Sequence, residues 1–170
     1  MKGIAVILIL IPLFTFPLSL IFMVPAFDLD NMPIEFYSCQ TTEGTQVTVV
    51  FKDEDHPNPF IDFIYDVYRY FKWGRIQDIE SFYIKDDYIF FPDDYASVTS
   101  FFETENLHTR AEIPLEKFKE FSKRKIIYIN TWNHMFSEKP LKGVSYILFF
   151  PSFKKGCRID AERKYSFLVK

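Results

Sequence analysis

Glycine is scarce in this sequence of 170 residues, and its scarcity excludes the common nucleotide sites. The chain has five glycines, and they do not form the clusters that a P-loop or a dinucleotide fingerprint requires. The nucleophile motif G-x-S-x-G is missing, as are the metal and redox motifs H-E-x-x-H and C-x-x-C. The sequence therefore lacks the usual signatures of nucleotide-binding proteins, serine hydrolases and zinc enzymes.

Charge is absent between Ile4 and Phe27, where the side chains are almost all apolar. A helix of this length reaches about 36 Å, which exceeds the ~30 Å hydrocarbon core of a bilayer. Three prolines within the run favour a kinked helix over a straight one. We therefore predict a transmembrane anchor or signal segment at residues 1–27, in contact with the lipid bilayer through residues 4–27.

The flanking charges predict the orientation of this segment. Lys2 precedes the apolar run, whereas acidic residues follow it from Asp28 onward. Because positive charge stays on the cytoplasmic side, we expect a single-pass protein of the cell membrane, with its amino terminus in the cytoplasm and its carboxy-terminal domain outside. The sequence Val-Pro-Ala ending at Ala26 also fits a signal peptidase site, and cleavage there would give a secreted protein.

Cysteine occurs twice, at Cys39 and Cys157. In an oxidising compartment the two thiols could pair and close a long loop, which the entropy model values at about 4 to 5 kcal/mol. Two separate buried thiols fit the sequence as well. The Cys39–Cys157 disulfide is thus one of two alternatives.

The hydrophobic pattern of the remaining chain predicts an α+β fold. Apolar residues recur at helical spacing from Phe60 to Phe71, with Asn58 as the amino-terminal cap and Gly74 as the stop, and a short helix is expected from Pro114. Alternating patterns predict strands at residues 45–52, 79–85, 88–91, 96–103, 107–113, 125–130, 144–150 and 165–169.

These elements combine into a mostly antiparallel sheet of about six to eight strands, with one long amphipathic helix and one short helix packed on it. The transmembrane segment precedes this sheet. We place a juxtamembrane linker at residues 28–44 and the extracytoplasmic domain at residues 45–170. Aromatic residues make up 19% of the chain, so we expect a core filled by large rings.

Two acidic regions are candidates for a cation site. Ca²⁺ prefers hard oxygen ligands, which carboxylates in loops supply. Neither region has the spacing of an EF-hand, and aspartate is also common in turns for reasons unrelated to metals. We predict no cofactor, with calcium as the one cation to be considered. The candidate ligands are Asp53, Glu54, Asp55, Asp86, Asp87, Asp93 and Asp94.

Candidates for acid–base chemistry are few and scattered along the sequence. His56 directly follows the acidic run that contains Asp53 and Asp55, and His134 lies in the sequence Trp-Asn-His. A general base needs a partner within hydrogen-bonding distance, and the spacing of these residues does not establish one. We therefore leave open whether the chain is an enzyme and favour a role without catalysis.

The charge balance argues against a nucleic-acid partner. Basic residues cluster near Lys123 and Lys154, but the net charge is −3 and the domain is expected outside the cell. Our leading hypothesis is a membrane-anchored extracytoplasmic binding or assembly module, with a protein partner or self-association. The alternative is a membrane-anchored hydrolase that uses carboxylate and histidine residues.

A minor alternative comes from the start of the chain. The sequence Met1-Lys2-Gly3, followed by an apolar run and a strand-rich domain, resembles a type IV pilin or a related filament subunit. The resemblance implies processing after Gly3 and filament assembly through the hydrophobic helix. This chain departs from the family at Leu8, where pilins usually carry a glutamate, and in its early prolines.

Overall fold

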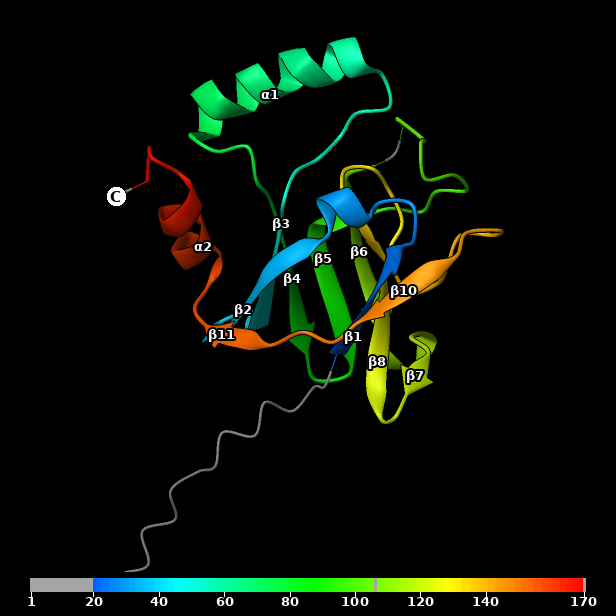
Figure 1. Cartoon of the computed structure of the whole chain (residues 1–170). Coiled ribbons are helices and arrows are strands. Elements are labelled where there is room, and N and C mark those ends of the chain that lie inside the picture. Colours follow the sequence, from blue (N-terminus) through cyan, green and yellow to red (C-terminus); the bar gives the residue numbers. More distant parts are fainter. Residues whose placement is uncertain (1–19, 106, 170) are drawn as a thin grey trace, which may run out of the picture.

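The computed structural model describes residues 20–105 and 107–169, which form one mixed sheet with two α-helices (Figure 1). The helices are α1 Pro59–Trp73 and α2 Arg158–Tyr165, and the short 3-10 turns are η1 Leu29–Asn31 and η2 Leu115–Lys117. The strands are β1 Leu20–Pro25, β2 Pro33–Thr41, β3 Gly44–Phe51, β4 Asp78–Lys85, β5 Tyr88–Tyr95, β6 Thr109–Pro114, β7 Glu120–Phe121, β8 Arg124–Ile129, β9 Phe136–Ser137, β10 Tyr146–Phe149 and β11 Phe153–Lys155.

The strands follow the order β10-β1-β8-β9-β5-β4-β3-β2-β11, with β6 paired to β5 and β7 to β8. Strands β2 to β5 form an antiparallel meander, whereas the pairs β1–β8, β5–β9 and β2–β11 are parallel. The sheet curls into a half-barrel, α2 lies at its side, and α1 lies across one end, apart from the strands (Figure 1).

Large aromatic rings fill the concave side of the sheet, as predicted. Phe22 on β1 contacts Phe36 on β2, with 5.0 Å between ring centroids, and Phe82 meets Phe136 edge-on at 5.1 Å. Phe51 and Phe91 complete this cluster with no exposed surface. Rings at these separations pack at interior density and add to the burial energy of the core.

The predicted fold class is wrong. The sheet is mixed rather than mostly antiparallel and contains 11 strands, more than the six to eight expected. The long helix was expected to pack on the sheet through its apolar side. Phe63, Val67 and Phe71 on that side are exposed, which shows that this contact is not made. Two features account for the difference between the predicted and the observed sheet. Strands form in the amino-terminal third of the chain, and distant segments pair in parallel.

Several local predictions need correction as well. Residues 96–103 do not pair with residues 107–113, since β6 pairs with β5 instead. The segment after Pro114 is a single 3-10 turn, and the strand expected at 165–169 is replaced by the end of α2 and an extended tail. The hairpin formed by β4 and β5 around Asp86-Asp87 is confirmed.

Part of the predicted anchor is a strand of the sheet. Leu20–Pro25 form β1 between β8 and β10, where Ile21 and Phe22 are fully buried. Strand β2 falls in the segment expected to be a linker. The apolar residues 4–19 and the processing position after Gly3 lie outside the described residues. Within the described residues, we find no helix that is long and apolar enough to cross a membrane.

The disulfide between Cys39 and Cys157 is confirmed, with 5.2 Å between the two Cα atoms. It joins β2 to the amino-terminal cap of α2 and closes a separation of 118 residues. In the entropy model a loop of this length contributes about 4 to 5 kcal/mol to stability. The bond therefore fixes α2, which supplies two side chains to the cleft described next.

Candidate functional site

Helix α1 is held in place by its polar side. Asn58 caps the helix, because its Oδ1 accepts hydrogen bonds from the backbone N–H groups of Phe60 and Ile61, and Gly74 ends it with φ 67°. Arg69 points inward and is 1% exposed. Its guanidinium donates to Asp53 at 3.2 Å and to the carbonyl of Ile76.

Two further carboxylates surround the same guanidinium. Nη1 of Arg69 lies 3.6 Å from Asp66 Oδ1 and 3.9 Å from Glu54 Oε2. A buried charge is tolerated only when it is paired and hydrogen-bonded, and Arg69 is both. This arginine and its partners are what fix the orientation of α1.

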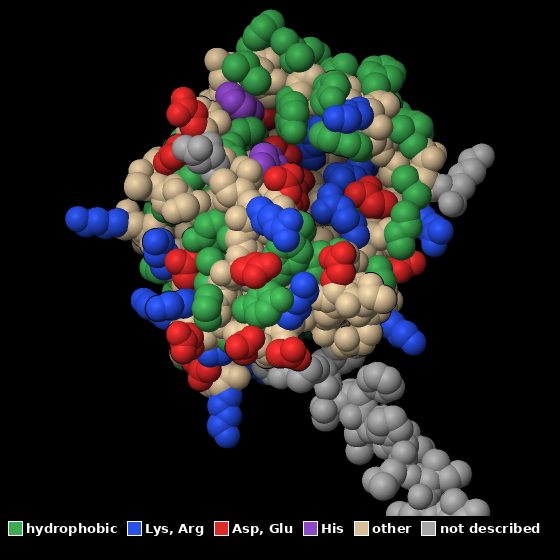
Figure 2. Space-filling model, turned by 180° about the vertical axis from the view of Figure 1, so that it is seen from behind, with side chains coloured by type: hydrophobic (Ala, Val, Ile, Leu, Met, Phe, Trp, Pro, Cys, Tyr) green, Lys and Arg blue, Asp and Glu red, His purple; other side chains and the backbone are tan. Residues whose placement is uncertain are grey.

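A cleft of about 420 Å³ lies between the inner side of α1, helix α2 and strands β3, β4 and β5. Its walls are mostly charged, and Figure 2 shows these side chains gathered in a hollow beneath an apolar cap. The carboxylates are Glu54, Asp78, Glu80, Asp93, Asp94 and Glu162, the arginines are Arg69, Arg75 and Arg158, and the aromatic residues are Tyr65, Trp73 and Tyr83.

The arginines of the cleft are engaged by its carboxylates. Nε and Nη2 of Arg75 donate to the two oxygens of Glu162 at 2.9 and 3.1 Å, a bidentate pair between the α1–β4 loop and α2. Arg158 lies 3.8 Å from Glu80 and 3.5 Å from Glu162. The cleft is therefore polar but contains few free charges.

Two neighbouring acids line the cleft, Glu80 on β4 and Asp94 on β5. Burial and the charges of Asp78 and Asp94 raise the pKa of Glu80 well above its ordinary value, and burial also raises the pKa of Asp94. The two side chains are hydrogen-bonded to each other, and Asp94 Oδ2 also accepts from the backbone N–H of Ser81 at 3.1 Å. This is the arrangement expected when Glu80 carries the proton and Asp94 the charge.

His134 continues this network behind the cleft wall. Its Nδ1 lies 3.0 Å from Asp78 Oδ2, its Nε2 lies 3.7 Å from Asp28 Oδ2, and its ring stacks on Phe51 at 3.9 Å. Burial works to raise the pKa of Asp78, but the hydrogen bond and charge of His134 lower it below its ordinary value. The predicted candidate His134 thus reaches the cleft only through Asp78, and its φ of 57° fixes it in a tight turn.

The other predicted catalytic residues make contacts around the loop before α1. Asp53 pairs with Arg69, and Asp55 accepts a hydrogen bond from Asn31 at 3.0 Å. Nδ1 of His56 accepts from the backbone N–H of Asn58 at 2.9 Å. These contacts hold the loop before α1, and Asp55 is connected to His134 indirectly, because Asn31 also donates to Asp28.

The candidate metal ligands are divided between separate places. Glu54, Asp93 and Asp94 line the cleft, Asp53 and Asp55 flank it, and Asp86 and Asp87 lie in the turn between β4 and β5. Among residues 20–105 and 107–169, we find no group of three or more histidine, cysteine or acidic side chains placed to hold a metal ion.

Sequence reasoning missed the residues at the centre of the cleft. Asp78 and Glu80 lie at alternate positions of a largely buried strand, so both side chains point to the same face of the sheet. Two acids placed in this way are the one sequence pattern that could have indicated the cleft. Arg69 gave no signal of its own, because an arginine in an amphipathic helix is expected on the solvent side. Arg75 and Arg158 lie in a loop and a helix that only the tertiary fold brings together.

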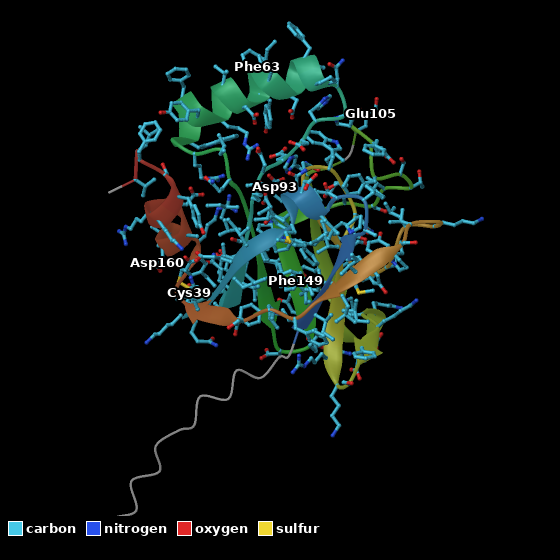
Figure 3. All side chains as sticks on the ribbon, in the orientation of Figure 1. Cys39, Phe63, Asp93, Glu105, Phe149 and Asp160 are labelled. Carbon is cyan, nitrogen blue, oxygen red and sulfur yellow. A yellow bond between two sulfur atoms is a disulfide. The ribbon has the colours of Figure 1, made fainter. Side chains whose placement is uncertain are left out.

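The outer face of α1 is apolar and exposed. Phe63 lies on the side of the helix that points away from the sheet (Figure 3), and Figure 2 shows an apolar cap at this end of the molecule. Exposure ranges from 42% at Val67 to 74% at Phe71. The outer face consists of Phe60, Ile61, Phe63, Ile64, Val67, Tyr68, Tyr70 and Phe71. An amphipathic helix normally turns such a face toward its own core.

Comparisons with protein-family models, with curated proteins and with solved structures gave no match. No residue of the cleft or of α1 therefore acquires a role from a relative. The possible functions follow from two features, the Glu80–Asp94 pair in the cleft and the exposed outer face of α1.

Proposed function

We propose that the protein is a binding or assembly module that docks onto a protein surface through the outer face of α1. The observation that carries this proposal is the orientation of the helix, with Arg69 inward and Phe63 and Phe71 outward. At 150–250 Å² for each aromatic side chain, the outer face presents on the order of 800 Å² of apolar surface. Patches larger than a few hundred Å² mark interaction sites on soluble domains.

A protein surface suits this face better than a lipid surface. Helices that lie on membranes have basic residues along their polar side, whereas the polar side of α1 faces the cleft and Lys72 is its one exposed basic residue. The charged residues of α1, two aspartates with Arg69 and Lys72, sum to zero. Helix α1 also lies at the opposite end of the sheet from Leu20, where β1 begins (Figure 1).

The compartment that we propose is extracytoplasmic. The Cys39–Cys157 disulfide supports this location, since such bonds persist in oxidising compartments and are rare in the cytosol. The apolar residues 4–19 would act as the export segment. Docking partners would then be exported proteins.

Photo-crosslinking in the producing cell tests the docking function. Benzoylphenylalanine replaces Phe63 on the outer face, which is 66% exposed, and, in a control, Phe121 on β7, which is 50% exposed. We expect a protein adduct from position 63 and none from position 121. A lipid adduct alone, or no adduct from position 63, would contradict the proposal.

The Glu80–Asp94 pair supports a second candidate function, acid–base hydrolysis in the cleft. Asp94 would take a proton from water while Glu80 donates its proton to the leaving group, as in other paired-carboxylate sites. The test is hydrolysis of ester, glycoside, phosphoester and peptide substrates by the wild type and by Glu80→Gln, with Asp86→Asn as control. Turnover that is lost only in Glu80→Gln supports this function, and its absence for every substrate class counts against it.

A further inference from the structure

The outer face of α1 is suited to pairing with itself. Its members include no charged side chain, so two copies facing each other would bury no unpaired charge. Phe60, Ile64, Val67 and Phe71 recur at intervals of four, three and four residues, which is the spacing of the apolar seam between paired helices. The same face on each subunit is what a two-fold symmetric interface requires.

The apolar surface extends beyond the helix. The ring of Phe167, in the segment after α2, lies 5.0 Å from the ring of Tyr70, and Phe167 and Leu168 are both about half exposed. A standard stable interface buries about 800 Å² on each partner. The outer face of α1 reaches this area, on the order of 800 Å² from its side chains, before the extension is counted.

The helix is also ready to dock without rearrangement. Arg69 and its carboxylate partners hold α1 from the inner side, so pairing would not draw the helix out of a core. Interfaces that are formed in the free protein avoid the entropic cost of ordering a segment during association.

Resting on the proposed docking function, we infer that the partner of the outer face is a second copy of this chain, with the two α1 helices packed antiparallel about a two-fold axis. The antiparallel arrangement places the amino-terminal end of each helix beside the carboxy-terminal end of the other, which their dipoles favour. Val67 of both copies lies at the centre of the contact, with Phe63 beside it and Phe60 and Phe71 toward the helix ends.

Sedimentation equilibrium of the full chain tests this inference. We expect a concentration-dependent monomer–dimer equilibrium, and a dissociation constant raised at least 100-fold by Phe63→Glu. Phe121→Glu, on β7, is the matched control and leaves the dissociation constant unchanged. Circular dichroism verifies that both variants are folded, and Phe71→Glu provides a second test on the same face.

The outcomes separate this inference from the docking function. A chain that remains monomeric while position 63 forms an adduct with a different protein overturns self-association and leaves docking intact. A monomer without any protein adduct overturns both. A dimer that is unaffected by Phe63→Glu and Phe71→Glu uses another surface and also contradicts the inference.

Discussion

Glu54 illustrates how the position of one residue determines its charge. It belongs to an acidic run that reads as a solvated loop in the sequence, yet its side chain is buried beside Arg69 and Asp78. Burial and the charge of Asp78 raise the pKa of Glu54 to about 9. The caps Asn58 and Gly74 could be predicted because their roles are local, whereas burial of Glu54 depends on segments distant in the sequence.

Replacing Glu54 by glutamine should weaken the dependence of stability on pH. Because the folded-state pKa lies above the ordinary value of 4.5, the folded protein keeps a proton that the unfolded chain releases, so stability falls as pH rises from about 5 to 9. In Glu54→Gln we expect this loss to shrink by about 1–3 kcal/mol, as measured by urea unfolding at pH 5 and pH 8.5.

Glu35 provides the control for this experiment. Burial acts to raise its pKa, but hydrogen bonds from Lys154 and Lys164 lower it to about 2. Its contribution to stability is therefore present above about pH 4.5 and is lost as pH falls through about 2. Glu35→Gln should leave the change between pH 5 and 8.5 as in the wild type. If Glu54→Gln does the same, Glu54 is not buried in its protonated form.

At the scale of the element, periodicity predicts that α1 is a helix but does not predict which way its apolar side faces. Helical spacing and the caps define where the helix begins and ends. The direction of its apolar side depends on which contacts are available, and Arg69 with its three carboxylates turns the polar side inward. Residues 96–103 are a similar case, because they have a strand-like pattern but pack as a loop with Trp132 and Met135.

Removing the guanidinium should release α1 from the domain. Arg69→Met leaves the carboxylates of Asp53 and Asp66 without their counter-ion, and we expect a loss of about 3–5 kcal/mol, the range for breaking a buried ion pair. Lys72→Met, on the exposed side of the same helix, should change stability by less than about 0.5 kcal/mol. Denaturant unfolding and hydrogen exchange of the α1 amides measure both. Equal effects of the two substitutions would contradict the role of Arg69.

At the scale of the whole molecule, segments distant in the sequence complete the sheet. Strand β1 pairs with β8 and β10, and β11 pairs with β2 beside the Cys39–Cys157 disulfide. Parallel pairs between distant segments leave no local signature, which explains why the antiparallel prediction was wrong. Part of the uncharged run ending at Phe27 forms β1, and a strand buried on both faces is apolar throughout, so the absence of charge at residues 20–25 has a second interpretation besides a membrane span.

Truncation distinguishes these two interpretations of the amino-terminal run. Deleting residues 1–19 leaves intact all the strands among the described residues and should preserve cooperative unfolding. Deleting residues 1–26 also removes β1, including the fully buried Ile21 and Phe22, and should abolish it. Thermal unfolding followed by near-ultraviolet circular dichroism measures both. A cooperative transition at the same temperature in the shorter chain would mean that β1 is dispensable and that cleavage after Ala26 is compatible with the fold.

The orientation and pairing of α1 can be measured together by hydroxyl-radical footprinting of the full chain over a range of concentrations. In dilute solution, Phe63 and Phe71 should be oxidised rapidly and the inward-facing Tyr65 slowly. As concentration rises, oxidation of Phe63 and Phe71 should fall while that of Phe121 stays constant. Rapid oxidation of Tyr65 with slow oxidation of Phe63 at every concentration, or rates that do not depend on concentration, would contradict the account.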